Sequence, residues 1–386
     1  IKISKKTLQD LEYESVVEQI AELNVTSLGK TKILNTVPFS NRNEVSRSLN
    51  LTNEFLTSFE NENRIPNHGF EDITKELKLI KIENNYLEIN GFRKIASCCI
   101  TSNILIKFFK KHKDYYPLLN TLSSTNVINT IIPDAINDVI DKHGEIRNNA
   151  SDLLYTTRKS IQSVRTKVNS SFNSALSTYN SAEYLDDIRE TVMENRRVLA
   201  VKSMHRRKVK GSILGSSKTG SIVYIEPETT HQHQRELNNL EFEETEEIKR
   251  ILLELTSLIS VYSNYLSKCQ FYLTEMDVIY AKAKYAKSIQ AVLPKITETQ
   301  EIYLVDAYHP LLLVSNRKEE TKTYPQTITM TTKSRIIVIS GPNAGGKSIT
   351  LKTVGLLQLM VQSGMLIPVH ESSKVCLFDS ILSDIG

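Results

Sequence analysis

Tryptophan is absent from the 386 residues, and phenylalanine and tyrosine together supply an aromatic content of only 7%. Aromatic side chains fill much of the volume of large packed cores, so their scarcity argues against a thick β-sandwich and suits a helical protein. Cysteine is also scarce, with four scattered residues and no spacing typical of metal ligands. This favours free thiols in a reducing compartment over a zinc site or a disulfide framework.

Long apolar runs are missing as well. No segment approaches the roughly 18–20 residues needed to span a bilayer, and no apolar core follows the lysine-bearing N-terminus as in a signal peptide. These absences predict a cytoplasmic protein with no membrane partner. The chain begins without methionine and stops at Gly386, so we expect both ends to be cuts. The net charge is only +4, so any nucleic-acid surface must be a local patch.

The first 145 residues are predicted to be helical, because apolar residues recur at spacings of three and four and prolines separate helices of ordinary length. An uninterrupted stripe over about 146–186 predicts one long helix, and a second stripe follows over 229–290. The second stripe alternates fours and threes, which is typical of a coiled-coil seam. We expect the two segments to pair antiparallel as an arm. Two separate core helices of a bundle are the alternative.

Residues 187–228, between the arm segments, are predicted to contain β-structure, because short apolar runs alternate with glycines. This tip is strongly basic, with nine lysines or arginines from Arg189 to Lys218 against Glu190 and Glu194. A charge run is usually only a solvated face, but this one is the chain's main departure from charge balance. We therefore predict contact with nucleic-acid phosphates. The residues assigned to this contact are Arg196, Arg197, Lys202, Arg206, Arg207, Lys208, Lys210 and Lys218.

From about residue 295 the pattern changes to short β-rich runs at 302–305, 327–330 and 335–340, which predicts an α/β domain. Residues 341–348 read Gly-Pro-Asn-Ala-Gly-Gly-Lys-Ser, a full match to the phosphate-binding pattern G-x-x-x-x-G-K-[ST]. The apolar run before it and the helix-like run 349–362 after it supply the strand–loop–helix context that the motif requires. A glycine-rich turn with an incidental lysine is the alternative.

The residue types of this loop suit ATP and Mg²⁺. Glycines let backbone N–H groups surround phosphate oxygens, and the start of a helix favours negative charge. Lys347 is assigned to the β- and γ-phosphates and to catalysis, and the Ser348 hydroxyl to Mg²⁺. The nucleotide-binding residues are predicted to be Gly341, Pro342, Asn343, Ala344, Gly345, Gly346, Lys347, Ser348 and Ile349.

Phosphoryl transfer also needs a carboxylate that holds Mg²⁺ through water. After the strand-like run Lys374–Phe378 the only carboxylates are Asp379 and Asp384, and neither ends a strand of four hydrophobic residues. The hydrolytic half of the site is therefore expected to be missing from these residues, and we do not expect them to hydrolyse ATP by themselves.

The stretch from Ser340 to Leu356, continuing to Pro368, resembles the ATPase opening of MutS proteins, and Gly-Pro-Asn before Gly-Gly-Lys is its distinctive part. Other segments similar to that family are Met276-Asp277, Ala281–Ala283 and His309–Leu311. Within it, the chain looks most like the second bacterial type, the paralogue without a mismatch-reading domain, because of Leu8–Glu12 with Leu28-Gly29 and of the tip from Val198 to Pro227. The resemblance covers essentially the whole chain.

The resemblance implies a multidomain protein that is mainly α-helical. Its parts would be a helical core (1–145), an ascending helix of a long antiparallel coiled-coil lever (146–186), a small β-containing clamp (187–228), a returning lever helix with core (229–294) and the first half of an α/β P-loop ATPase domain of the ABC type (295–386).

The resemblance also implies a homodimer with composite ATP sites, ATP-dependent binding of branched or recombination DNA, suppression of homologous recombination, and a small nuclease domain beyond these residues. The alternative is an ATPase that senses stalled or collided ribosomes and splits them by gripping rRNA, since phosphate contacts do not distinguish DNA from RNA. A mechanical coiled-coil ATPase fits poorly, because its P-loop would precede a far longer coil, and no Asn-Lys-x-Asp motif supports a GTPase. His309 is expected to pack a turn, and Tyr324 to stack on adenine or pack at the surface.

Overall fold

The computed structural model describes residues 1–342 and 346–385. The fold is rich in helices and divides into two compact units. Unit 1 combines Ile1–Lys81, Gly91–Asp134 and the chain from Val261 onward, and unit 2 combines Ile82–Asn90 with Ala135–Ser260. No helix in the described part of the chain is both long enough and apolar enough to cross a membrane.

Short helices fill the first 140 residues, as their spacing of apolar residues predicts. They are α1 (Lys5–Asp10), α2 (Tyr13–Ala21), α3 (Ser27–Leu34), α4 (Arg42–Thr57), α5 (Thr74–Leu79), α6 (Ile89–Lys111), α7 (Pro117–Ser124) and α8 (Ile131–Val139). Helix α2 shows why they form, because Tyr13, Val16, Val17 and Ile20 are all buried and occupy one face at helical spacing. That face packs into the core of unit 1.

The same core receives three helices from the C-terminal part of the chain: α11 (Ser263–Ser288), α12 (Pro310–Lys318) and α13 (Lys347–Gln362). Buried residues of α11 and α13, such as Ala281, Tyr285, Leu356 and Met360, join those of α2 in one cluster. Segments that are more than 250 positions apart in the sequence therefore share one core.

Unit 1 also holds a small sheet with the strand order β5-β8-β6-β7. Its strands are β5 (Lys295–Ile296), β6 (Ile302–Ala307), β7 (Gln326–Met330) and β8 (Lys374–Val375). Strand β6 is antiparallel to both neighbours, and β5 is parallel to β8. The runs 302–305 and 327–330, predicted as strands, lie within β6 and β7.

The predicted strand at 335–340 is wrong. A strand is held by backbone hydrogen bonds to a neighbour, and no described segment pairs with these residues. Ile336 and Val338 are 82% and 85% exposed, whereas Ile337 and Ile339 face a cavity together with Ile328. The alternation of apolar residues typical of a strand is present, but none of the described strands pairs with these residues.

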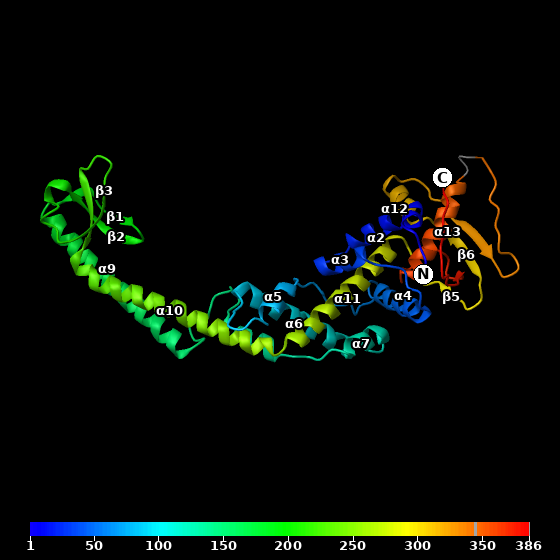
Figure 1. The fold of residues 1–386 in the computed structure, drawn as a ribbon, viewed down its shortest axis with the longest axis horizontal. Helices are drawn as coiled ribbons and strands as arrows, with labels where there is room; N and C mark the ends of the chain where they lie inside the picture. The colour runs from blue at the N-terminus through cyan, green and yellow to red at the C-terminus, as the bar shows by residue number, and fades with distance from the viewer. Residues whose placement is uncertain (343–345, 386) are drawn as a thin grey trace. The chain divides into compact units, whose positions relative to one another are not determined.

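Unit 2 is built on two long helices, α9 (Asp152–Ser181) and α10 (Glu228–Ser260). Three side-chain pairs join them: Arg158 to Glu244 at 2.6 Å, Arg165 to Glu241 at 2.8 Å, and Ser171 to the Thr229 carbonyl at 2.8 Å. Numbers rise along one helix while they fall along the other, so the helices are antiparallel. Figure 1 shows them side by side.

Both segments predicted for this pair are longer than the helices found. Helix α9 starts at Asp152, because the Ser151 hydroxyl accepts from Leu154 N and caps it, and it ends before Glu183, whose φ is +58°. The predicted returning segment 229–290 is divided at Val261 and Tyr262 into α10 and α11. Neither proline nor glycine marks this break, so the residue pattern gave no signal for it.

A four-stranded antiparallel sheet joins α9 to α10, in the order β1-β2-β4-β3. Its strands are β1 (Leu185–Met193), β2 (Arg196–Lys202), β3 (Gly211–Ser216) and β4 (Ile222–Pro227). The apolar runs 198–201, 212–214 and 222–225, from which the sequence predicts strands, lie within the last three, whereas nothing in the sequence predicts β1. Leu199, Val201, Val223 and Ile225 form the buried face of the sheet and pack with Phe172 of α9, which attaches the sheet to the end of the helix pair (Figure 1).

Candidate functional site

Helix α13 fixes the position of the phosphate-loop residues in unit 1. Its C-terminal half is buried, while its first turn is exposed or half-buried. Two side chains hold the residue after the helix: the Tyr13 hydroxyl lies 2.7 Å from the Ser363 hydroxyl, and Lys282 Nζ donates to the Ser363 carbonyl at 2.8 Å. The buried end therefore sets the direction of the first turn, whose backbone N–H groups have no partner within the helix.

The loop leads into α13 through a left-handed residue. Gly346 is the N-cap of the helix and has a φ of +80°, a conformation that glycine adopts at little cost. Lys347 is the first residue of the helix, and its Nζ donates to the Gly341 carbonyl at 2.5 Å. This bond joins the two ends of the loop.

The other residues predicted for nucleotide binding differ in their exposure to solvent. Gly341, Pro342 and Ser348 are exposed, and Ile349 is half-buried in the first turn. Asn343, Ala344 and Gly345 lie outside the described residues. An exposed hydroxyl and a lysine at the start of one helix match the chemistry of a phosphate site.

A carboxylate lies beside the same helix one turn further along. Glu12 is 3.5 Å from Lys352 Nζ of α13 and 3.7 Å from His309 Nε2. His309 is buried at the N-cap of α12, and its burial lowers the pKa of the imidazole, with the Glu12 carboxylate acting in the opposite sense. This position agrees with a packing role for His309. Tyr324 is 72% exposed, with the Lys322 ammonium 5.2 Å from its ring centre.

The basic residues of the sheet in unit 2 fall into two groups. Arg196 pairs with Glu226 at 3.0 Å, and Arg197 pairs with Glu190 at 2.6 Å while its guanidinium lies over the Phe172 ring. These two arginines hold the sheet together and are poorly placed for a first contact with a phosphate. The sequence could not distinguish them from their neighbours.

The second group is open to solvent. Arg206, Arg207, Lys208 and Lys210 are exposed in the turn between β2 and β3, and Val209 anchors that turn in the core of the sheet. Lys208 lies 5.1 Å from the centre of the Tyr184 ring. Lys218 is exposed in the next turn, and Lys202 is half-buried. Four cations within five residues form the densest positive surface of the predicted set.

Sequence reasoning missed a buried carboxylate in unit 1. Asp277 of α11 is fully buried and accepts hydrogen bonds from Val25 N at 2.9 Å, from Thr26 N at 2.9 Å and from the Thr26 hydroxyl at 2.6 Å, and it lies 3.0 Å from His68 Nε2. Burial raises the pKa of this carboxyl, but the hydrogen bonds from His68, Thr26 and Val25 together lower it below its usual value. Asp277 therefore remains ionised and joins α11 to the segment before α3.

Metal ligation has no support outside the phosphate loop, because the described residues contain no cluster of three or more His, Cys, Asp or Glu side chains able to hold an ion. All four cysteines are free and buried. Cys99 and Cys269, distant in the sequence, lie within hydrogen-bond reach of each other.

Comparison with known proteins gives two kinds of match, one to the C-terminal residues and one to the whole chain. Residues 337–386, which include the phosphate loop and α13, match the family model of MutS domain V. Over 386 residues the chain is 30% identical to the Endonuclease MutS2 of Alkaliphilus oremlandii, and over 384 residues it is 32% identical to that of a Geobacillus species. The Endonuclease MutS2 of Pediococcus pentosaceus is also 32% identical, over 389 residues.

These alignments cover 99–100% of this chain but 48% of each relative, so the chain spans about half the length of the curated relatives that it matches. The similarity extends over both units, and the domain V match falls on the loop that the structure places at the start of α13. The chain therefore belongs to the MutS family, as a relative of its MutS2 proteins.

Proposed function

We propose that this chain is the nucleotide-binding and DNA-contacting part of an ATP-dependent DNA-binding protein. The observation that carries the proposal is the phosphate loop, where a left-handed glycine turns the chain into α13 and Lys347 closes the loop. In this proposal Lys347 binds the β- and γ-phosphates of ATP, and Ser348 binds Mg²⁺. Residues 341–349 form the cradle around the phosphates.

The two units then take different roles. Residues 295–386 are the first part of an ABC-type P-loop ATPase domain, and residues 1–145 are a helical core. Within residues 146–186 and 229–294, helices α9 and α10 form a coiled-coil lever, supported by their antiparallel pairing, and the part from Val261 onward belongs to the core. The sheet within 187–228 is a clamp, supported by its exposed turn of four cations.

For the whole protein we propose a homodimer that acts on branched or recombination DNA and suppresses homologous recombination. The curated relatives are named endonucleases, and we assign any such activity to residues outside this chain. A carboxylate that completes the magnesium site is assigned there too, since neither Asp379 nor Asp384 ends a strand of four hydrophobic residues.

Binding of ATP with Mg²⁺ to the Lys347→Ala variant tests this proposal. Loss of charge-assisted hydrogen bonds to phosphate is expected to weaken affinity by at least about tenfold, since such bonds contribute about 1.5–3 kcal/mol. The matched control is Lys352→Ala, which removes a lysine one turn further along the same helix and is expected to bind ATP like the parent. Equal ATP affinity in the Lys347→Ala variant and the parent protein would refute the proposal.

A further inference from the structure

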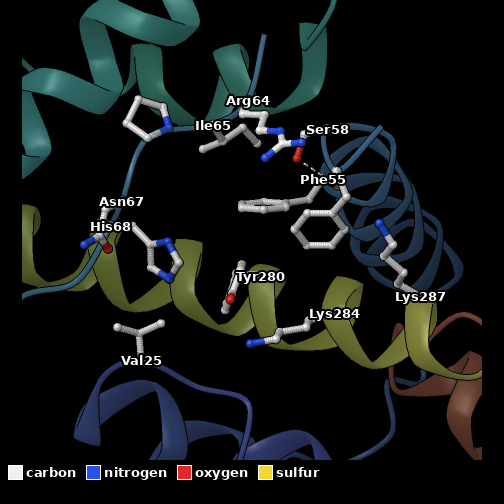
Figure 2. Close-up of a pocket in the computed structure, with 12 residues that line it drawn as sticks. Val25, Phe55, Ser58, Arg64, Ile65, Asn67, His68, Tyr280, Lys284 and Lys287 are labelled. Carbon is white, nitrogen blue, oxygen red and sulfur yellow. Dashed lines mark hydrogen bonds between the residues drawn. The ribbon is translucent and has the colours of Figure 1, made fainter. Parts of the chain in front are cut away.

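A cavity of about 500 Å³ lies in unit 1 between α4, α11 and the segment before α5. None of its lining residues belongs to the phosphate loop, and its volume is in the range of small-molecule sites. Figure 2 shows the side chains that surround it.

One side of the cavity is aromatic. Phe55 of α4, Tyr280 of α11 and His68 lie with ring centres 4.8–6.4 Å apart, and Figure 2 shows the three rings around the same space. Phe59 extends this surface, 6.1 Å from Tyr280. A surface of this kind favours a planar ring, which can stack on one aromatic side chain while it meets the edge of another.

The orientation of His68 in this wall is fixed from behind. Its Nε2 lies 3.0 Å from the buried Asp277 carboxylate, which also accepts from the backbone of Val25, another lining residue. The hydrogen bonds hold the pKa of Asp277 low, so the carboxylate is ionised and His68 donates to it from Nε2. The His68 side chain is therefore held in one orientation, in which one ring face and the Nδ1 edge line the cavity.

The rim of the cavity is cationic. Arg64, Lys284 and Lys287 line it and are exposed, and no carboxylate is among the lining residues. In the described part of the chain none of the three cations forms an ion pair, and the two lysines instead lie 5.4 Å and 5.5 Å from the rings of Tyr280 and Phe59. Figure 2 shows Arg64 and Lys284 on opposite sides of the space. Uncompensated cations around a partly enclosed space attract an anion.

From the combination of these two surfaces we infer that the cavity binds a nucleoside phosphate, separately from the phosphate loop. The base lies against the wall formed by Phe55, His68 and Tyr280, and the phosphate lies at Lys284 and Lys287, three residues apart on α11. A purely apolar ligand would leave three cations without a partner, and inorganic phosphate would leave the aromatic wall uncovered. A phosphorylated planar ring satisfies both surfaces.

The test uses the Lys347→Ala variant, so that the phosphate loop does not contribute, and monophosphates that lack the groups which Lys347 is proposed to bind. Isothermal titration calorimetry with AMP and GMP is expected to show saturable binding, with at least tenfold weaker binding of adenosine and of pyrophosphate. Absence of saturable binding of both monophosphates would overturn the inference. It would leave the function of Lys347 untouched, since that is measured with ATP in the parent protein.

The cationic rim is then tested by adding Lys284→Glu and Lys287→Glu, which are exposed changes that should leave the circular dichroism melt unchanged. Affinity for the monophosphates is expected to fall at least tenfold. The matched control is Lys110→Glu with Lys111→Glu, two exposed lysines of α6 that change the net charge equally. An equal loss in the control would show that only overall charge matters, and would overturn the assignment to this cavity.

The aromatic wall is tested with Tyr280→Leu, which keeps an apolar side chain but removes the ring. AMP binding is expected to weaken at least fivefold while pyrophosphate binding is unchanged. A parallel titration with a 5′-phosphorylated tetranucleotide distinguishes the source of the ligand. Tighter binding of AMP identifies a free nucleotide, and tighter binding of the oligonucleotide identifies the phosphorylated end of a nucleic acid. Equal AMP binding by the Tyr280→Leu variant would contradict the inference.

Discussion

Lys282 is the residue whose environment is most unusual for its type. Its ammonium is almost fully buried in unit 1 and donates to the Ser363 carbonyl at the end of α13. Burial, with a smaller contribution from Lys32, lowers the pKa of Lys282 to about 8. Because an unfolded lysine has a pKa near 10.4, the unfolded state binds this proton more strongly than the folded state does.

This difference predicts a pH dependence of stability with a defined sign. Below pH 8 Lys282 is protonated in both states, and the cost of burying its ammonium lowers the free energy of unfolding most. This cost decreases as the pH rises from about 8 to about 10.4. Between pH 7 and pH 9.5 the contribution of Lys282 should therefore raise the free energy of unfolding by about 2 kcal/mol.

Urea unfolding at several pH values measures this contribution as the difference between the parent and the Lys282→Met variant, which has no titrating group at this position. Lys268→Met, an exposed change on the same helix, is the control and should keep the slope of the parent. If the Lys282→Met protein shows the same rise in stability as the parent, the buried ammonium is not its source.

At the same scale, sequence reasoning found the loop but not the hydrogen-bond network around Asp277. The phosphate loop was predictable because its information is local: eight consecutive residues carry the pattern. The partners of Asp277 were not, because Thr26 and His68 lie 251 and 209 positions away in the sequence. Whether a carboxylate is buried and hydrogen-bonded depends on tertiary packing, which periodicity does not encode.

Among the elements, the sheet of unit 2 shows a close approach that a side chain would prevent. Strand β3 begins at Gly211, and a Cβ built there would lie 2.0 Å from the Glu226 carbonyl oxygen of the neighbouring β4. Backbone atoms cannot move aside as a flexible side chain can. Gly215 of the same strand is different, since a Cβ there would first meet the terminal methyl of Met193, at 2.8 Å.

We therefore expect Gly211→Ala to displace the start of β3 from β4 and to lower the free energy of unfolding of unit 2 by at least about 2 kcal/mol. Hydrogen exchange measured by mass spectrometry should be faster over 211–216 and over 222–227. Gly215→Ala is the matched change and should have less than half this effect. Equal protection in the Gly211→Ala and parent proteins would mean that the strands separate at no cost.

Element boundaries show where local patterns stop being informative. The helical face of α2 and the strands β6 and β7 follow directly from apolar spacing. The strand expected at 335–340 does not form. An alternation of apolar residues is not sufficient for a strand, because a strand also needs a paired neighbour. The division between α10 and α11 has no breaker residue, so it could not be read from the sequence, and α11 packs against α3 and α4 in unit 1.

Over the whole molecule, charge is nearly balanced while its distribution is not. A net charge of +4 on 386 residues gives no general attraction to nucleic acid. The exposed turn with Arg206, Arg207 and Lys208 concentrates positive charge in one place. If this turn contacts phosphates, binding must depend on it and must weaken with salt through the release of counterions.

Reversal of Arg206 and Arg207 to glutamate is therefore expected to weaken binding of a branched DNA at least about tenfold and to reduce the salt slope by about two. Fluorescence anisotropy at several salt concentrations measures both quantities. Reversal of Lys110 and Lys111 is the control, since the net charge changes equally. An rRNA hairpin measured in parallel shows which nucleic acid the turn prefers. Unchanged DNA affinity and salt slope would exclude the turn as a contact.

The bonds at Ser363 have one more consequence. Helix α13 is a rigid rod of 16 residues, about 24 Å long, with the phosphate loop at one end and the hydroxyl of Tyr13 and the ammonium of Lys282 at the other. A rod cannot shift at one end alone. Any ligand that pulls the loop must strain these two bonds or move α2 and α11 with it. If the loop binds a triphosphate, part of the binding energy would act on α2 and α11 through these two bonds.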